Sequence, residues 1–421
     1  MITRDLRRGP NSVPMSKKGD VAPSGAIEAA YYVSLLYTYL SPALGISIGL
    51  LGAAMLAGVA ALCVRHFKFR LAAFEPIKFP VAFAVSYIAV QVLAHDQTIL
   101  SDGVRDYVSW IFSVIVMQSL IRRPGFLHRF MVLMFSIGLV SMPFLVFRDA
   151  GQVVERAAAS GGASGLSNAN ALAAWFGFCA VYFMVLGLES KRDAIRLLSW
   201  VLVAGCLLVI GFTVSRGALL AVVLAGILVF RRLPRRGLLP ISILIFGSAV
   251  AFGAGVYRQS VESYTERGAE ESGRLVVWPV AAERFLDNPL TGVGLSNIGS
   301  YVPGRNTPIT PHNVFLSIGL ASGILPLIFY IAYWLKAASG SLRLNRLKTA
   351  SAPFYPPMLI FTFVVLMLGE NSVTAWVVFA LAGPLQYTQR KARQQHGRTE
   401  MLRSRPPLWR HRHERSAQWQ R

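Results

Sequence analysis

The sequence predicts an all-α integral membrane protein with about twelve transmembrane helices and a large external loop between the ninth and tenth. Three observations predict this class. Hydrophobic residues make up 54% of the 421 residues and charged residues only 15%, whereas charged residues average roughly a quarter of a soluble domain. Apolar runs near the roughly 20 residues that cross a bilayer recur along the chain. Every second connection between these runs is rich in Lys and Arg.

The apolar runs divide the chain into five parts. A basic N-terminal segment, 1–25, lacks a cleavable signal pattern, so the first span is expected to stay in the membrane. Nine spans are expected within 26–256 and three within 314–387; a polar loop, 257–313, separates the two groups, and a basic tail, 388–421, follows. The expected spans are 26–40, 43–64, 77–94, 107–121, 130–147, 170–188, 197–213, 218–230, 238–256, 314–335, 354–368 and 373–387.

The Lys and Arg residues assign the connections to two sides. When the N-terminus is placed in the cytoplasm, the basic connections and the tail all fall on the cytoplasmic side. These connections are 65–70, 122–129, 191–196, 231–236 and 336–348. The external connections are mixed or acidic. Because the basic residues are spread over loops between spans and both termini, the net charge of +22 indicates membrane orientation and no nucleic-acid partner.

The cysteines predict neither a disulfide framework nor a zinc site. Cys63, Cys179 and Cys206 all fall inside apolar spans. Free cysteines in such positions behave as small core residues.

The segment 257–323 is the one long polar stretch between apolar spans. Loops longer than about 12–15 residues are usually functional or disordered. This loop also contains apolar and aromatic residues, among them Leu275, Val277, Trp278 and Phe285, which disordered segments lack. We therefore expect a folded lid beside the membrane that carries the chemistry.

Two arginines on the external side are candidate binding residues. Arg216 lies between two apolar runs, where an arginine is costly unless it faces a cavity or a partner; the alternative is an arginine that reaches the lipid headgroups with no specific role. Arg274 lies one helical turn before Trp278 and shares a face with it. The alternative for Arg274 is a surface arginine packed on an aromatic ring.

His312 is the candidate catalytic residue, within Pro311-His312-Asn313. The alternative is a residue at the start of a helix, with Asn313 or Thr310 as its N-cap.

Together these residues suit transfer from a diphosphate. Each guanidinium offers a planar pair of donors to phosphoryl oxygens, and an uncharged imidazole can act as general base for a sugar hydroxyl. The loop shows no tight Asp-x-Asp pair for a divalent metal. We therefore expect metal-independent chemistry without a cofactor, and supporting roles for Ser215, Trp278 and Asn313.

The glycine-rich stretches do not predict a nucleotide site. The segment 157–170 lacks the Gly-Lys-Ser/Thr ending of a phosphate loop. Gly292-x-Gly294 has no flanking strand, so these glycines are expected to make tight turns.

In order and spacing, these pieces resemble the O-antigen ligase and polymerase family of bacterial membrane glycosyltransferases, over roughly 213–323. The matching pieces are Ser215-Arg216-Gly217-Ala218-Leu219-Leu220, Arg274-x-x-x-Trp278, Asn288-Pro289-Leu290-x-Gly292-x-Gly294 and Pro311-His312-Asn313. The segment 165–173 also looks like an earlier external loop of the family.

The resemblance implies a helical inner-membrane protein with a large periplasmic lid and cytoplasmic termini. It implies a donor glycan on undecaprenyl diphosphate and a glycan or lipid A core as acceptor. Arg216 and Arg274 would hold the diphosphate, and His312 would activate the acceptor hydroxyl. The hydroxyl would invert the anomeric carbon and expel undecaprenyl diphosphate, in assembly of exopolysaccharide or lipopolysaccharide.

One departure from the family concerns an acidic residue that many relatives carry shortly after the His-Asn pair. Here the segment 319–323 reads Gly-Leu-Ala-Ser-Gly. Glu370, at the outer end of a later span, is a possible substitute.

Two alternatives stay open from the sequence. A ligase and a polymerase share the same donor headgroup, so Arg216, Arg274 and His312 do not discriminate between them. A membrane transporter or flippase would explain the spans without the lid, but it predicts ionisable residues near mid-membrane.

Overall fold

The fold is described from a computed structural model of the chain. The described residues are 25–40, 51–67, 78–97, 112–113, 115–117, 119–120, 123, 125–142, 145–149, 155–159, 169–213, 215–230, 274–301, 308–346 and 353–368. The predicted spans 238–256 and 373–387, both termini and Glu370 lie outside the described residues, as does most of the predicted span 107–121.

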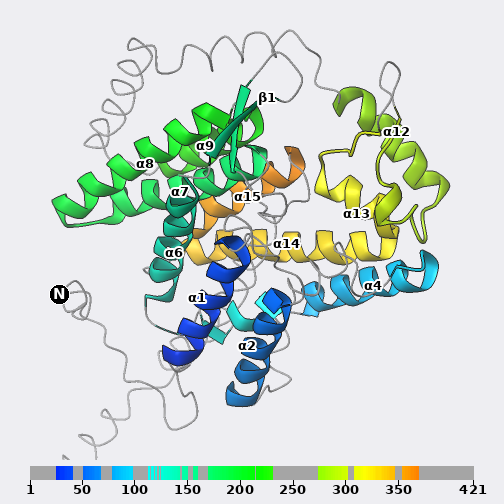
Figure 1. Cartoon of the computed structure of the whole chain (residues 1–421), viewed down its shortest axis with the longest axis horizontal. Coiled ribbons are helices and arrows are strands. Elements are labelled where there is room, and N and C mark those ends of the chain that lie inside the picture. Colours follow the sequence, from blue (N-terminus) through cyan, green and yellow to red (C-terminus); the bar gives the residue numbers. More distant parts are fainter. Residues whose placement is uncertain are drawn as a thin grey trace, which may run out of the picture.

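Helices dominate the described residues (Figure 1). The helices are α1 (Gly25–Leu40), α2 (Leu51–Phe67), α4 (Lys78–Ala94), α6 (Phe126–Ser141), α7 (Ala169–Glu189), α8 (Asp193–Thr213), α9 (Arg216–Phe230), α12 (Arg274–Asp287), α13 (Val314–Ser322), α14 (Ile324–Arg346) and α15 (Tyr355–Leu368), with a short 3-10 turn, η5 (Leu295–Asn297). Two of them, α7 and α8, are long and apolar enough to cross a membrane. The other apolar helices are shorter, so the count of about twelve spans stays a prediction.

A β-hairpin interrupts the helical order, which the sequence analysis did not predict. Strands β1 (Leu145–Asp149) and β2 (Glu155–Ala159) pair antiparallel, from Leu145 opposite Ala159 to Asp149 opposite Glu155. The predicted span 130–147 is therefore wrong at its end, since α6 ends at Ser141. Pro143 follows closely in the sequence, and proline removes a helical hydrogen bond and clashes with the preceding turn.

The predicted span 314–335 is also wrong, because it is two helices that meet at Gly323. Gly323 has a φ of +79°, which ends α13, and α14 starts at the next residue. Glycine adopts this left-handed backbone without the steric penalty of a side chain. In Figure 1, α14 runs alongside α4, and α13 lies with α12 on the other side of α14.

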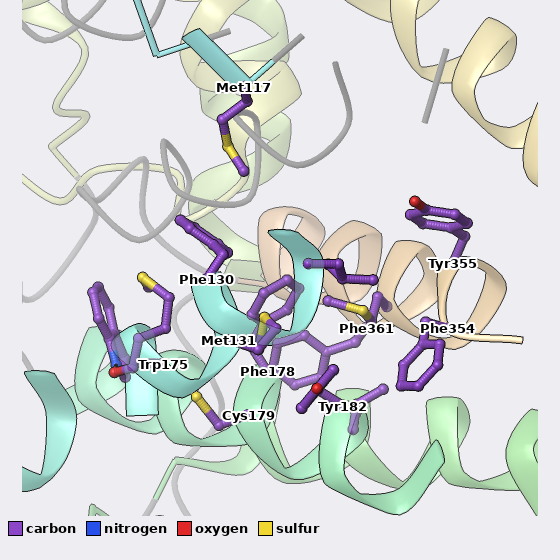
Figure 2. Packing of buried hydrophobic residues seen from close by; sticks show 14 of the residues in the cluster. Met117, Phe130, Met131, Trp175, Phe178, Cys179, Tyr182, Phe354, Tyr355 and Phe361 are labelled. Atoms are coloured by element: carbon purple, nitrogen blue, oxygen red, sulfur yellow. Dashed lines mark hydrogen bonds between the residues drawn. The ribbon is translucent and has the colours of Figure 1, made fainter. Parts of the chain in front are cut away.

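The apolar core lies around α7, where every residue from 171 to 185 is buried. Figure 2 shows Trp175 and Phe178 of α7 among aromatic side chains of α6 and α15. The indole Nε1 of Trp175 donates to the carbonyl oxygen of Met134 at 2.8 Å, which satisfies its polar group. Cys63, Cys179 and Cys206 are buried and free, as their positions predicted.

One set of helix ends is joined by an ion cluster. The Glu28 carboxylate, near the start of α1, lies 2.6 Å from the Arg123 guanidinium and accepts two bonds from Arg129, at 2.7 and 2.9 Å. Nearby, the Nδ1 atom of His128 lies 2.6 Å from the Tyr182 hydroxyl and joins the start of α6 to the C-terminal half of α7. The charge alternation of the sequence predicts that these basic residues face the cytoplasm.

Candidate functional site

The starts of α7, α9 and α13 come together around the end of α15. The Ser215 hydroxyl, 4% exposed, donates to the Asn170 side-chain oxygen at 3.0 Å. A Cβ atom on Gly217 would lie 3.5 Å from the Cβ of Leu368. The Asn313 amide nitrogen lies 4.0 Å from the Met367 sulfur. Residues from four distant parts of the sequence therefore meet at one end of the helical bundle.

Arg216 is the first residue of α9, and its side chain is exposed. The preceding Ser215 carbonyl accepts the first helical hydrogen bond, from the Leu219 amide at 3.1 Å. The first turn of a helix carries unpaired N–H groups and the positive end of the helix dipole. A guanidinium at this position adds a second positive group, so the start of α9 is suited to an anion.

His312 has a strained backbone. Its φ is +49°, in the left-handed region that residues other than glycine adopt rarely. Its side chain is half-buried. Residues held in such conformations persist where the surroundings fix them, and they cluster at functional sites.

The neighbours of His312 hold this backbone on both sides. On the N-terminal side, the indole Nε1 of Trp278 donates to the Pro311 carbonyl oxygen at 2.7 Å. On the C-terminal side, the Asn313 side chain caps α13, because its oxygen accepts from the amides of Phe315 at 3.0 Å and Leu316 at 3.2 Å. Asn313 is therefore the N-cap of α13, as the alternative interpretation of this segment expected, and the catalytic role of His312 stays a prediction.

Arg274 is the first residue of α12, so it lies one helical turn before Trp278, as predicted. The structure describes its backbone and leaves its side chain outside the described atoms. Trp278 thus bonds to the peptide group before His312, whereas Ser215 and Asn313 are the chain neighbours of Arg216 and His312. The position of the Arg274 guanidinium stays a prediction.

The lid is folded in its described residues, 274–301 and 308–313, as the sequence predicted. Arg284 of α12 donates to the carbonyl oxygens of Gly299 at 2.6 Å and Asn297 at 2.8 Å. Ser300 and Ile309 pair as an isolated antiparallel bridge. Arg284 therefore holds the chain after α12 against that helix, and the bridge pairs two parts of that chain with each other.

The Asn288–Gly294 segment docks its backbone on the junction of α13 and α14. The Val293 amide donates to the Leu320 carbonyl at 2.6 Å, and the Ile324 amide donates to the Pro289 carbonyl at 2.7 Å. A Cβ on Gly292 would lie 2.2 Å from the Leu320 oxygen. Gly292 and Gly294 have φ values of +67° and +85°, which confirms the predicted tight turns and adds a close backbone approach as their reason.

Three further polar residues of this region were not among the predicted site residues. Asn170 is the partner of Ser215. Gln91 on α4 bonds to Leu295, directly after the docked segment, and His95, the residue after the end of α4, bonds to Thr291 within that segment. A polar residue inside an apolar span is a usable signal, because membrane helices rarely keep one without a partner. Gln91, a polar residue within the apolar run of α4, is such a case.

Comparison with known families matches residues 201–331 to the family described as O-antigen ligase. The match contains Arg216, Arg274 and His312 and extends from α8 into α14. It confirms the resemblance over this segment. No curated protein matches the chain significantly.

Proposed function

From the premise that residues 201–331 form an O-antigen ligase segment, we propose that the protein is a bacterial inner-membrane glycosyltransferase of surface polysaccharide assembly. It transfers a glycan from undecaprenyl diphosphate to a sugar hydroxyl with inversion, and it uses no metal. The observation that carries this proposal is the convergence of Arg216 and the strained His312 at the end of α15, where Gly217 approaches Leu368 and Asn313 approaches Met367.

Arg216 binds the donor diphosphate together with the first turn of α9. As the bond between the sugar and the diphosphate breaks, negative charge grows on the leaving phosphate. A guanidinium and helix N–H groups fixed in advance stabilise that charge without reorganising. Arg274 serves as the second cation, since α12 places it one turn from Trp278, which itself bonds to the peptide before His312.

His312 acts as general base. The imidazole takes the proton of the acceptor hydroxyl while that oxygen attacks the anomeric carbon from the face opposite the diphosphate. The new carbon–oxygen bond forms, the bond to the phosphate oxygen breaks, and undecaprenyl diphosphate leaves with its electron pair. The Trp278 bond and the Asn313 cap act by orienting His312, because small misplacements of a reacting group are costly.

The flanking helices suit a lipid-linked donor. Large apolar side chains of α8 and α9 point outward, among them Leu197, Val201, Leu220 and Ile227, which are 45–63% exposed. A bilayer solvates such surfaces, whereas water does not. The start of α9, with Arg216, lies on the periplasmic side in the proposed orientation, beside the outer leaflet.

This chain lacks the acidic residue that many relatives carry shortly after the His-Asn pair. In the proposed reaction, the His312 imidazole therefore takes the proton without a carboxylate from that segment. The Ser322 hydroxyl, fully buried, donates to the Ile318 carbonyl at 2.8 Å. Gly323 approaches the backbone of Leu290 and Pro289. The segment 319–323 therefore serves packing, and Glu370 remains the proposed substitute for the family's carboxylate.

The test is complementation of a deletion strain with the wild-type chain, His312→Ala and Arg216→Ala, with membrane levels measured in parallel. We expect each substitution to abolish surface polysaccharide while the protein stays in the membrane. Normal polysaccharide with both variants would overturn the proposal. In the deletion strain, lipid A core without O-chains and with accumulated lipid-linked polymer identifies a ligase, and single repeat units identify a polymerase.

A further inference from the structure

Gln91, near the end of α4, is a fully buried polar residue in an apolar helix. Both ends of its side-chain amide are bonded. Its nitrogen donates to the Ala321 carbonyl oxygen at 2.6 Å, and its oxygen accepts from the Leu295 amide at 3.0 Å. Buried polar groups are costly unless they are bonded, so this amide is fixed in one orientation.

The two partners of Gln91 belong to the two segments that interlock beside the candidate site. Ala321 is in the last turn of α13, where helix carbonyls lack partners within the helix. Leu295 begins η5, directly after the docked Asn288–Gly294 segment. These segments also bond to each other through Val293 and Leu320. Gln91 therefore closes a joint of three elements.

His95, one turn further along, extends this joint. Its Nε2 atom donates to the Thr291 carbonyl oxygen at 2.9 Å. A Cβ on Gly294 would lie 2.9 Å from the Cγ of the His95 ring, so any side chain at this position would displace the imidazole. The Gln97 side chain donates to the Ser296 hydroxyl at 3.2 Å. The chain just after α4 thus docks along the lid by side-chain hydrogen bonds.

We propose that Gln91 is a positioning residue for the transfer reaction, which sets the placement of α13 and through it that of His312; this rests on the proposed function of His312. α13 has nine residues, about 13 Å at 1.5 Å per residue. A rigid helix of this length carries a shift at Ala321 to the Asn313 cap. Because one side chain bonds both α13 and the lid, the two segments cannot move independently.

The first test uses Gln91→Leu, which keeps the size of the side chain and leaves the Ala321 carbonyl and Leu295 amide without a partner. In the purified full chain, we expect hydrogen exchange over 288–297 and 313–323 to rise about tenfold, while α7 keeps its protection. We expect kcat of transfer to fall about tenfold with the donor KM within about twofold. The matched control is Ser86→Ala on α4, whose hydroxyl bonds the Phe83 carbonyl of the same helix.

The second test asks for rescue by Gln91→Glu. A protonated carboxyl can donate to Ala321 and accept from Leu295, whereas an ionised one can only accept. We expect both protection and kcat, relative to wild type, to fall about tenfold between pH 5 and pH 8. The wild-type chain carries the same titratable groups, Tyr87 on α4, His95 just after α4 and Tyr330 on α14, which packs against α4, and is measured over the same range. The Gln91 contacts on α13 and η5 are backbone groups.

The outcomes separate this inference from the proposed function. Unchanged exchange and kcat in Gln91→Leu would overturn the positioning role while leaving His312 intact as a base. Full transfer in His312→Ala would overturn the proposed function, and the exchange measurement would still decide whether Gln91 holds the joint. A loss of folded protein in Gln91→Leu with wild-type kcat per folded molecule would show a merely structural residue.

Discussion

The core around α7 and the joint at the end of α13 are packed by different means. In the core, glycines make room for side chains: a Cβ on Gly177 would lie 2.7 Å from the far edge of the Phe361 ring. In the joint, they make room for backbone: a Cβ on Gly323 would lie 2.1 Å from the Leu290 carbonyl oxygen. A ring can turn aside, whereas a peptide group held by hydrogen bonds cannot. The joint should therefore tolerate far less change than the core.

The largest effect is expected for Gly323→Ala. A Cβ would meet backbone, and alanine is strained at a φ of +79°. We expect a loss of about 3 kcal/mol or more in the free energy of unfolding and a fall in transfer of more than about 100-fold. Thermal unfolding of the purified protein and the transfer rate measure the two. Near-wild-type stability would show that the α13–α14 junction can relax as readily as the core around α7.

A smaller effect is expected for Trp278→Phe, which removes the bond from the indole to Pro311 and keeps an aromatic ring. A single hydrogen bond contributes about 1 kcal/mol, so we expect transfer to fall about fivefold. Polysaccharide synthesis per membrane-inserted protein measures the change. Equal activity of the variant and the wild type would mean that the Asn313 side alone holds His312.

The N-cap of α13 offers a test with an internal rescue. Asn313→Ala removes the acceptor for the amides of Phe315 and Leu316 and should cost about 1 kcal/mol of stability. Because the cap also orients His312, the same energy lost in the transition state should lower transfer about fivefold. Asn313→Asp keeps the acceptor and should restore most of it. If both variants lose the same activity, the amide has a role besides capping.

The smallest effect on transfer is expected for Gly177→Ala in the core. The added methyl group should displace the Phe361 ring and lower the unfolding free energy by about 1–2 kcal/mol, a typical result of overpacking. Transfer at a temperature where the variant is folded should stay within about twofold of wild type, since the site is unchanged. A loss comparable to that of Gly323→Ala would remove the distinction between core and joint.

The same distinction explains what the sequence could predict. Helices α7, α8 and α15 are apolar runs with no competing signal, and their predicted ranges agree with the structure to within a few residues. The break at Gly323 was missed because it depends on Leu290, a contact between backbones that leaves no apolar pattern. The β-hairpin was missed because Val146 and Phe147 extend an apolar run that reads equally well as helix.

The candidate residues were predictable because their chemistry is unusual for their places. An arginine at Arg216 and a histidine at His312 stand out between apolar spans. Their shared neighbourhood was not predictable from sequence, because it is created by Met367 and Leu368 at the end of α15, two ordinary apolar residues. Gln91 was overlooked because its role depends on partners more than 200 positions away.

The left-handed backbone at His312 determines how its imidazole should be removed. Alanine would lose the ring and also meet a conformational penalty of about 1 kcal/mol at a φ of +49°. Asparagine has no imidazole but is among the residues that accept this conformation most readily. His312→Asn therefore removes the general base while keeping the backbone conformation at position 312. The variant protein should still bind the donor.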